Sequence, residues 1–322
     1  MIIFDVIIIG SGPIGIACGM EAQKNNLSYL IIEKGCMVNS LYNYPDGMRF
    51  FSTSDKLEIN NIPFISNNIK PIKSEALEYY RRIADSNKLN IHLFEKVTEI
   101  KKVNSNFSVL TDKSNYTSKN VVIATGFYDF PNLLNVKGEQ LSKVSHYYKD
   151  AHFYSNQKVI LVGASNSSVD AALEIYRKGG FVTMIIRGKE LGKRVKYWVK
   201  PDIENRIEEG NIKVFYNSEI KKIEKNEVVI KTSKELKTIK NDFVLALTGY
   251  KPDFNFLKKI GITLSKDSEK SPMYNSKTME TNIEGVYLAG VICGGLETHK
   301  WFIENSRIHA SLIIENIKNE IK

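Results

Sequence analysis

The sequence predicts an α/β fold with two dinucleotide-binding (Rossmann-like) domains, one of which is inserted into a discontinuous other one. An apolar, β-branched strand over residues 1–9 leads into a glycine-rich turn and a helix, and the same order returns at residue 158. A further apolar strand begins near residue 243 and indicates that the chain then goes back to the first domain. The length of 322 residues also favours two domains over one.

The first repeat carries the spacing Gly-x-Gly-x-x-Gly at Gly10, Gly12 and Gly15, and its second strand ends in Glu33. In such a unit the first glycine makes a tight turn, and the second lets the backbone approach a pyrophosphate. The third lets helix and strand pack closely. The N-terminus of the helix attracts phosphates, and a carboxylate such as Glu33 can accept hydrogen bonds from a ribose. The first repeat therefore predicts a dinucleotide site.

The second repeat keeps the strand, turn and helix but loses two of the three glycines. Its second strand ends in Arg187, where the first repeat has an acid, and a basic run follows. An arginine here suits a ribose 2′-phosphate, so the prediction is NADP rather than NAD, and a solvated basic face is the alternative. The predicted contacts of this nucleotide are Gly163, Ser165, Asn166, Ser167, Ser168, Arg187 and Lys193.

Two further strands end in small residues. The strand over 116–123 runs into Ala124-Thr125-Gly126, an ending that is typical of flavoproteins with two dinucleotides. These small residues let the chain pass close to the first nucleotide as it leaves the first domain. The strand over 282–289 stops at Gly290, and a closing helix is expected over 302–317. Its N-terminus would approach the flavin ring.

These strands set the expected domain boundaries. Residues 1–126 and 243–322 are predicted to form a discontinuous FAD-binding domain, and residues 127–242 an inserted NADPH-binding domain. A helix over residues 74–84 is expected within the first part, with Ser74 as its N-cap.

Composition excludes several classes of function. Hydrophobic residues make up 43% of the chain, and the net charge of +9 would attract anionic partners. No nucleic-acid-binding motif and no apolar run of membrane-spanning length is present. The sequence begins inside a predicted strand without a signal peptide, and its three cysteines form no C-x-x-C. We therefore expect a reducing cytoplasm as the location.

Five motifs run through the chain, at residues 40–45, 50–54, 124–129, 145–148 and 302–307. They resemble those of the YpdA family, the bacillithiol disulfide reductases among the thioredoxin-reductase-like flavoproteins. The resemblance covers essentially the whole chain and implies FAD, NADPH and reduction of a low-molecular-weight disulfide. The implied and predicted FAD contacts are Gly10, Gly12, Pro13, Ile14, Gly15, Glu33, Lys34, Ser40, Val97, Ala124, Thr125, Gly126, Tyr128, Gly290, Val291 and Phe302.

The chain departs from these relatives at three positions. Thioredoxin reductases carry a C-x-x-C in a region that here reads His146-Tyr147-Tyr148, so no dithiol is available. Ile14 stands where bacillithiol disulfide reductases carry a cysteine, and Val291 where many relatives carry an aspartate. Cys18 lies one helical turn beyond Ile14, but a small buried residue is the simpler interpretation. The catalytic residues therefore stay unassigned.

Three functions fit these observations. The leading one is reduction of bacillithiol disulfide or a related small disulfide. The second is a thioredoxin-reductase-like ferredoxin- or flavodoxin-NADP reductase, which an aromatic such as Tyr128 near the flavin would suit. The third is a flavin-bound redox sensor. The expected partner is a small disulfide or an acidic electron-carrier protein. A homo-oligomer is expected, and nucleic acid, membrane and metal are not.

Overall fold

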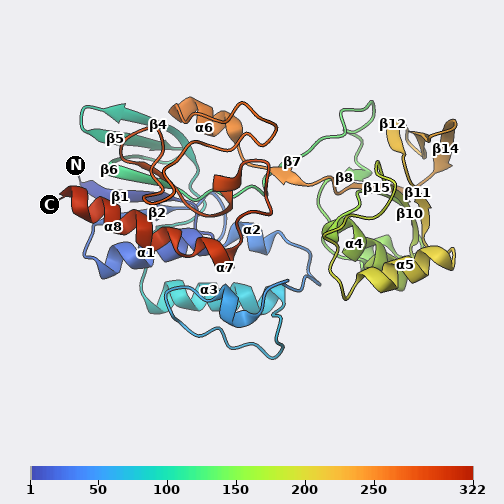
Figure 1. The fold of residues 1–322 in the computed structure, drawn as a ribbon, viewed down its shortest axis with the longest axis horizontal. Helices are drawn as coiled ribbons and strands as arrows, with labels where there is room; N and C mark the ends of the chain where they lie inside the picture. Colours follow the sequence, from blue (N-terminus) through green and yellow to red (C-terminus); the bar gives the residue numbers. More distant parts are fainter. Residues whose placement is uncertain (1, 322) are drawn as a thin grey trace. The chain divides into compact units, whose positions relative to one another are not determined.

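The structure, a computed structural model, describes residues 2–321 and divides into two compact units. The first unit contains the residues up to Phe130 together with those from Tyr250 onward, and the second is Pro131–Gly249. Each unit has its own largely parallel sheet with helices packed on it (Figure 1). The prediction of an α/β fold with two Rossmann-like units is confirmed.

The sheet of the first unit has seven strands in the order β3-β2-β1-β6-β5-β4, with β17 paired to β6. Strands β1, β2, β3, β6 and β17 pair in parallel, whereas β4 and β5 form an antiparallel hairpin beside β6. The strands are β1 Ile3–Ile9, β2 Tyr29–Ile32, β3 Ile91–His92, β4 Val97–Val103, β5 Asn106–Thr111, β6 Asn115–Ile123 and β17 Val286–Leu288. Because β17 follows the inserted unit, the insertion interrupts this sheet in sequence but not in space.

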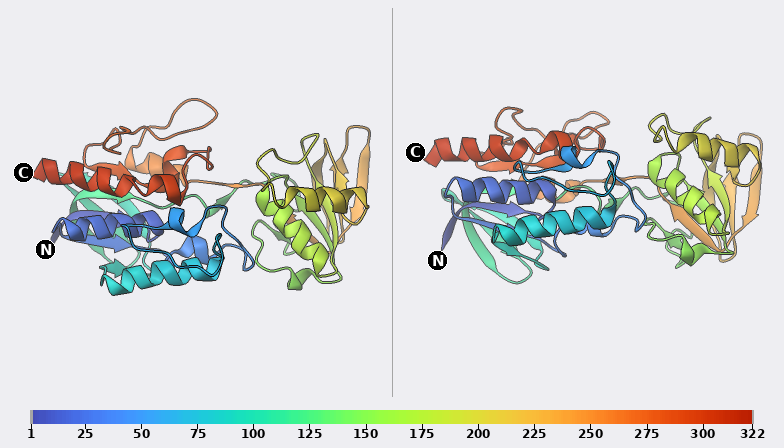
Figure 2. Two further views of the ribbon diagram at one scale, coloured as in Figure 1. Left: turned by 60° about the horizontal axis from the view of Figure 1, so that its bottom comes forward. Right: turned by 90° about the horizontal axis from the view of Figure 1, so that it is seen from below.

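Small residues bring the first helix of this unit close to its neighbours. A Cβ atom at Gly19 would lie 2.5 Å from Cδ1 of Ile31 in β2. Helix α8 (red) runs alongside α1 (blue) in both views of Figure 2. The helices are α1 Pro13–Lys24, α2 Asn39–Tyr42, α3 Lys73–Ser86, α6 Phe254–Ile260, α7 Ile303–Ser306 and α8 His309–Ile321, with 3-10 turns η1 Ser54–Leu57 and η3 Gly290–Gly294.

The second unit contains a five-stranded parallel sheet in the order β11-β10-β9-β15-β8 and a separate antiparallel sheet, β12-β13-β14. Helices α4 Asn166–Arg177 and α5 Lys200–Glu208 and the turn η2 His152–Tyr154 complete it. The strands are β8 Val144–Ser145, β9 Lys158–Val162, β10 Phe181–Ile185, β11 Lys213–Phe215, β12 Glu219–Ile223, β13 Glu227–Lys231, β14 Leu236–Lys240 and β15 Phe243–Ala246.

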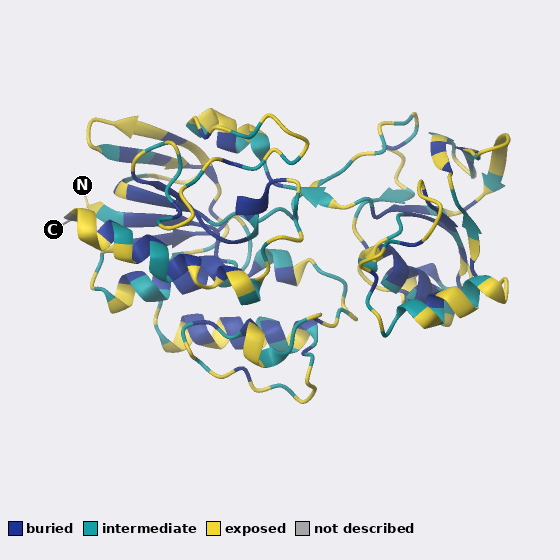
Figure 3. Ribbon diagram, in the orientation of Figure 1, coloured by how far each residue is buried: buried dark blue, intermediate teal, exposed yellow. Residues whose placement is uncertain are grey.

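Burial follows the sheet type. The inner strands of both units are dark blue in Figure 3, and Val6–Ile9 of β1 is buried on both faces, as a parallel strand between layers should be. The hairpin strand β4 is buried only in part. Among the described residues, no helix has both the length and the apolar character needed to cross a bilayer.

The second domain boundary lies seven residues beyond the predicted one. Strand β15, which was expected to open the final part of the FAD-binding domain, pairs with β9 in the sheet of the second unit. The unit therefore ends at Gly249 rather than at residue 242, because a central parallel strand stays with the sheet that buries it. The first boundary falls after Phe130 rather than residue 126. Next to these boundaries, strand β7 Phe130–Pro131 pairs with β16 Tyr250–Lys251.

Two helix predictions also need correction. Helix α3 begins at Lys73 rather than Ser74, since Oε2 of Glu75 accepts a hydrogen bond from the N–H of Ile72 at 2.9 Å. The closing helix is two helices, α7 and α8. The hydroxyl of Ser306 donates to the carbonyl of Phe302 at the last residue of α7, and the regular helix resumes only at His309.

Candidate nucleotide sites

The first glycine turn requires glycine at two positions for steric reasons. Gly10 has a φ of +105°, and a Cβ atom there would lie 2.6 Å from the carbonyl oxygen of Ala124. A Cβ atom at Gly15 would lie 1.9 Å from the carbonyl oxygen of Gly10. Any side chain at either position would displace the backbone where β1 turns into α1.

Gly12 is different, because a Cβ atom there would meet nothing within 4 Å. Gly12 is the N-cap of α1, and no side chain caps the first turn of this helix. Pro13 has no N–H, so the uncapped donors begin with the backbone of Ile14. The turn therefore offers open space directly in front of helix N–H groups, and this arrangement fits a pyrophosphate.

Glu33 ties this turn to the end of β2. It is 6% exposed, and its Oε2 accepts hydrogen bonds from the backbone N–H of Ser11 at 2.8 Å and from the Ser11 hydroxyl at 3.3 Å. Its Oε1 accepts from the N–H of Gly35 at 3.0 Å. A carboxylate has further lone pairs, so Glu33 can still accept a ribose hydroxyl while it holds the turn.

Other predicted residues from distant segments converge on the same turn. The Ala124 carbonyl and the Thr125 Cα atom lie beside Gly10, and a Cβ atom at Gly126 would lie 3.9 Å from the hydroxyl of Ser40. A Cβ atom at Gly290 would lie 3.3 Å from Cγ1 of Ile14, the second residue of α1. The structure thus brings the ends of β1, β6 and β17 together at the start of α1.

The remaining predicted residues of the first unit lie around this cluster. Lys34 forms an ion pair with Asp129, and Val97 is buried at the start of β4. Phe302 is 51% exposed at the start of α7, whereas Val291 is half-buried in η3. Their contact with a nucleotide stays a prediction.

Sequence reasoning missed a lysine that orders the loop after α2. Lys73 is buried, and its Nζ donates to the carbonyl of Tyr44 and to Oδ1 of Asp46, both at 2.7 Å. The ring of Tyr44 then packs edge-on against Tyr128, with 4.7 Å between the ring centroids, and Tyr128 packs against Tyr250 at 4.4 Å. Asp46 and Lys73 are 27 positions apart in the sequence, so no local signal predicts this contact.

The second glycine turn is closed by a hydroxyl. A Cβ atom at Gly163 would lie 2.6 Å from the carbonyl oxygen of Leu247, so this glycine is also required. Ser168 is fully buried, and its hydroxyl donates to the carbonyl of Ser165 at 2.8 Å. Ser165 and Ser167 are exposed at the start of α4, and no side chain caps this helix.

The basic segment folds back onto the start of α4. The amide of Asn166 donates to the carbonyl of Arg194 at 3.0 Å and accepts from the N–H of Lys196 at 2.8 Å. The N–H of Gly192 donates to the carbonyl of Ala164 at 2.8 Å. Asn166 therefore positions this loop, a role that its place in the glycine motif did not suggest. Arg187, Lys193 and Arg194 themselves are exposed.

None of the three cysteines has an environment that favours a thiolate. Cys18 is fully buried, and burial raises the pKa of its thiol to about 12. Cys293 is 1% exposed, and burial raises its pKa as well. Burial, and secondly the nearby carboxylate of Glu33, raises the pKa of Cys36. A nucleophilic cysteine needs the opposite shift, so these three environments do not favour a catalytic thiol.

His146 and His299 also lack the setting of a catalytic proton donor. Nε2 of His146 lies 3.3 Å from Oε1 of Glu139. The same carboxylate accepts from the N–H groups of Leu134 and Asn135, so this pair stabilises a loop of the second unit. His299 is exposed.

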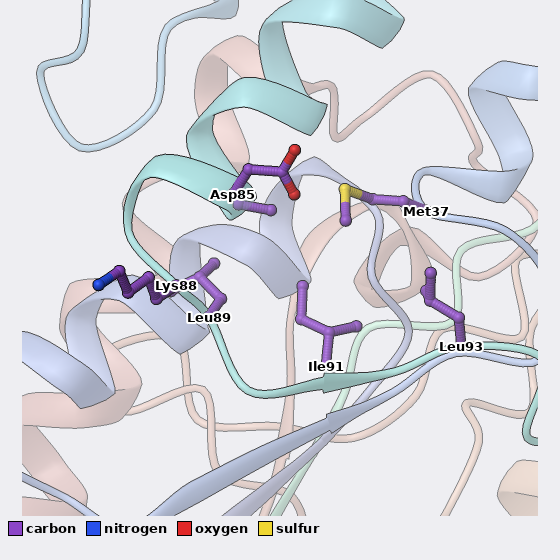
Figure 4. Close-up of a pocket in the computed structure, with 7 residues that line it drawn as sticks. Met37, Asp85, Lys88, Leu89, Ile91 and Leu93 are labelled. Carbon is purple, nitrogen blue, oxygen red and sulfur yellow. The ribbon is translucent and has the colours of Figure 1, made fainter.

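A separate pocket of about 300 Å³ lies near the end of α3 (Figure 4). Apolar side chains dominate it, with one acid and one base, and it contains no predicted site residue. Its lining consists of Met37, Ala84, Asp85, Lys88, Leu89, Ile91 and Leu93.

The chain matches the family model described as "Pyridine nucleotide-disulphide oxidoreductase" over residues 7–290. It is 44% identical to the bacilliredoxin reductase Bdr of Bacillus subtilis, over 98% of each chain. The structure superposes on the bacillithiol disulfide reductase Bdr (YpdA) of Staphylococcus aureus with a TM-score of 0.97, 40% identity and full coverage of both chains. For the Bacillus cereus protein of the same name, the TM-score is 0.96 at 41% identity, over 98% of this chain and 99% of that one.

Thioredoxin reductases and ferredoxin–NADP reductases also match, at lower identity. The expected cofactors, FAD and NADPH, are those of this group of flavoproteins. The open space at Gly12 is consistent with them. The chain therefore belongs to the pyridine nucleotide-disulphide oxidoreductases and, within them, to the YpdA family of flavin oxidoreductases.

Proposed function

We propose that this enzyme uses NADPH and FAD to reduce a disulfide that contains bacillithiol. The relatives point to this acceptor by name: two are bacillithiol disulfide reductases, and one is a bacilliredoxin reductase. The observation that supports binding of a redox nucleotide is the uncapped start of α1 behind Gly12. A Cβ atom at Gly12 would meet none of the described residues within 4 Å. Uncapped N–H groups beside open space are donors that a pyrophosphate can accept from.

Each unit contributes one nucleotide site in this proposal. In the first unit, the N-terminus of α1 holds the pyrophosphate of FAD and Glu33 holds its ribose. In the second, Arg187 and Lys193 pair with the 2′-phosphate of NADPH beside the uncapped start of α4. Bound FAD supplies a group that can take up a hydride and pass electrons on. The residues named here orient the two nucleotides.

The acceptor is reduced without an enzyme thiolate. Ile14 removes the cysteine that relatives carry in the glycine motif, and the pKa values of the three remaining thiols are raised. Disulfide reduction in this chain therefore depends on access of the acceptor to the flavin. A cytoplasmic location and a homo-oligomer complete the proposal, and the three free cysteines fit a reducing compartment.

An acceptor screen tests this function. The purified protein, with its FAD content confirmed, is mixed with NADPH and one acceptor: bacillithiol disulfide, a bacillithiolated bacilliredoxin, ferredoxin or flavodoxin. We expect NADPH oxidation with a bacillithiol-containing disulfide and release of free thiol. A variant with Cys18, Cys36 and Cys293 all replaced by serine is the matched control and should keep this activity. Turnover with ferredoxin or flavodoxin alone would favour a ferredoxin- or flavodoxin-NADP reductase. No turnover with any acceptor would favour a flavin-bound redox sensor.

A further inference from the structure

A buried histidine holds the turn that follows β17. Gly290 has a φ of +84°, and a Cβ atom there would touch Ile14 near the start of α1. The N–H of Gly290 donates a hydrogen bond to Nδ1 of His309 at 3.1 Å. His309 is the first residue of α8 and is only 1% exposed. The imidazole therefore links α8 to the turn that packs on Ile14.

The groups around the imidazole keep it neutral. Burial lowers the pKa of His309 to about 4. Sγ of Cys293 lies 4.0 Å from Nδ1, and its raised pKa keeps that thiol protonated. The indole ring of Trp301 packs edge-on, with 4.5 Å between the ring centroids. Since Nδ1 accepts the Gly290 N–H, the ring proton lies on Nε2.

This Nε2–H has no hydrogen-bond partner among the described residues, although it is buried. A buried donor without a partner is costly, and buried donors in folded proteins are almost always paired. An apolar side chain would fill the same space without that cost. The contact that explains a histidine at this position is therefore the hydrogen bond from the Gly290 N–H to Nδ1.

We propose that His309 is a positioning residue of the FAD site. Its Nδ1 accepts the hydrogen bond of the Gly290 N–H and so fixes the Gly290 turn against Ile14 at the start of α1. This inference rests on the proposed FAD site.

Three substitutions at His309 distinguish the role of Nδ1 from that of Nε2. In His309→Asn, the side-chain oxygen stays near the position of Nδ1, but the Nε2–H is lost. In His309→Gln, a donor stays near Nε2, but the acceptor for Gly290 is lost. His309→Leu removes both. The exposed His152 of the second unit, changed to leucine, serves as the matched control.

The readouts are the FAD dissociation constant of each variant, the visible spectrum of its bound flavin, and the melting temperature of its FAD-free form. We expect His309→Leu to bind FAD about ten- to a hundredfold more weakly, since a buried backbone donor loses its acceptor. His309→Asn should recover most of this affinity, His309→Gln little of it, and His152→Leu should match the wild type. If His309→Leu does not fold, the proposal is still tested by comparing the other two variants, because His309→Asn should bind FAD more tightly than His309→Gln.

Wild-type FAD affinity in His309→Leu, or equal losses in Asn and Leu with none in Gln, would overturn the positioning role. Wild-type protein that binds no FAD at all would instead refute the proposed function.

Discussion

The two glycine turns of this molecule share one pattern of strand, turn and helix, yet different means hold them closed. At Gly15, a side chain is excluded because a Cβ atom would lie 1.9 Å from a carbonyl oxygen. At the corresponding position of the second turn, Ser168 fits and donates a hydrogen bond to Ser165. The second turn therefore tolerates a hydroxyl where the first tolerates nothing. A degenerate glycine motif can keep its backbone shape when the replacement side chain pairs with that backbone.

The turns also differ in charge and in what holds them. The acidic Glu33 binds the N–H groups of Ser11 and Gly35 and so stiffens the first turn from the strand side. In the second turn, Asn166 instead ties down a loop that displays Lys193 and Arg194. One repeat thus presents an acid beside its helix start and the other presents bases, as expected for two different nucleotides.

The largest effect is expected from Gly15→Ala. The added Cβ atom would overlap the Gly10 carbonyl, so the variant should lose about 3 kcal/mol or more in free energy of unfolding and should bind no FAD. Urea denaturation and flavin absorbance measure the two effects. Ser168→Ala in the second turn is the matched control and should lose only about 1 kcal/mol, the value of one hydrogen bond. Similar losses in both variants would break the contrast between the turns.

A smaller and more selective effect is expected from Arg187→Ala. A charge-assisted hydrogen bond to the 2′-phosphate contributes about 1.5–3 kcal/mol, so KM for NADPH should rise about ten- to a hundredfold. KM for NADH should stay almost unchanged, because NADH lacks this phosphate. Steady-state kinetics with both nucleotides give the answer, with the exposed neighbour Lys189→Ala as the control. Equal losses with NADPH and NADH would show that Arg187 supports the structure rather than selecting the nucleotide.

The cysteines give a third prediction, and all three lie in the first unit. Their raised pKa values mean that at pH 8 each thiol is mainly protonated and a poor nucleophile. We expect iodoacetamide to leave Cys18 and Cys293 unmodified in the folded protein and to react with Cys36 slowly. Peptide mass spectrometry identifies the modified sites, and the denatured protein is the positive control. Rapid modification of Cys18 would contradict the absence of an enzyme thiolate.

Local patterns predicted much of this structure. Both repeats, the roles of Gly10 and Gly15 and the burial of Cys18 follow from spacing and residue size. The end of the second unit could not be predicted in this way, because β15 is an apolar strand that would suit either sheet. Only its pairing with β9 shows to which unit it belongs. Lys73 and His309 were missed because their partners are distant in sequence: 27 residues from Asp46 and 19 from Gly290. No periodicity encodes such contacts.

The most direct test of the account is Gly12→Ala. Gly12 has an ordinary φ of −65°, and the new methyl group meets none of the described residues within 4 Å, so the free energy of unfolding of FAD-free protein should change by less than about 0.5 kcal/mol. The same methyl group occupies the space assigned to the pyrophosphate, so the FAD dissociation constant should rise at least about tenfold. Unchanged stability with weakened FAD binding is the predicted result. Unchanged FAD binding would contradict the assignment of this turn to the cofactor.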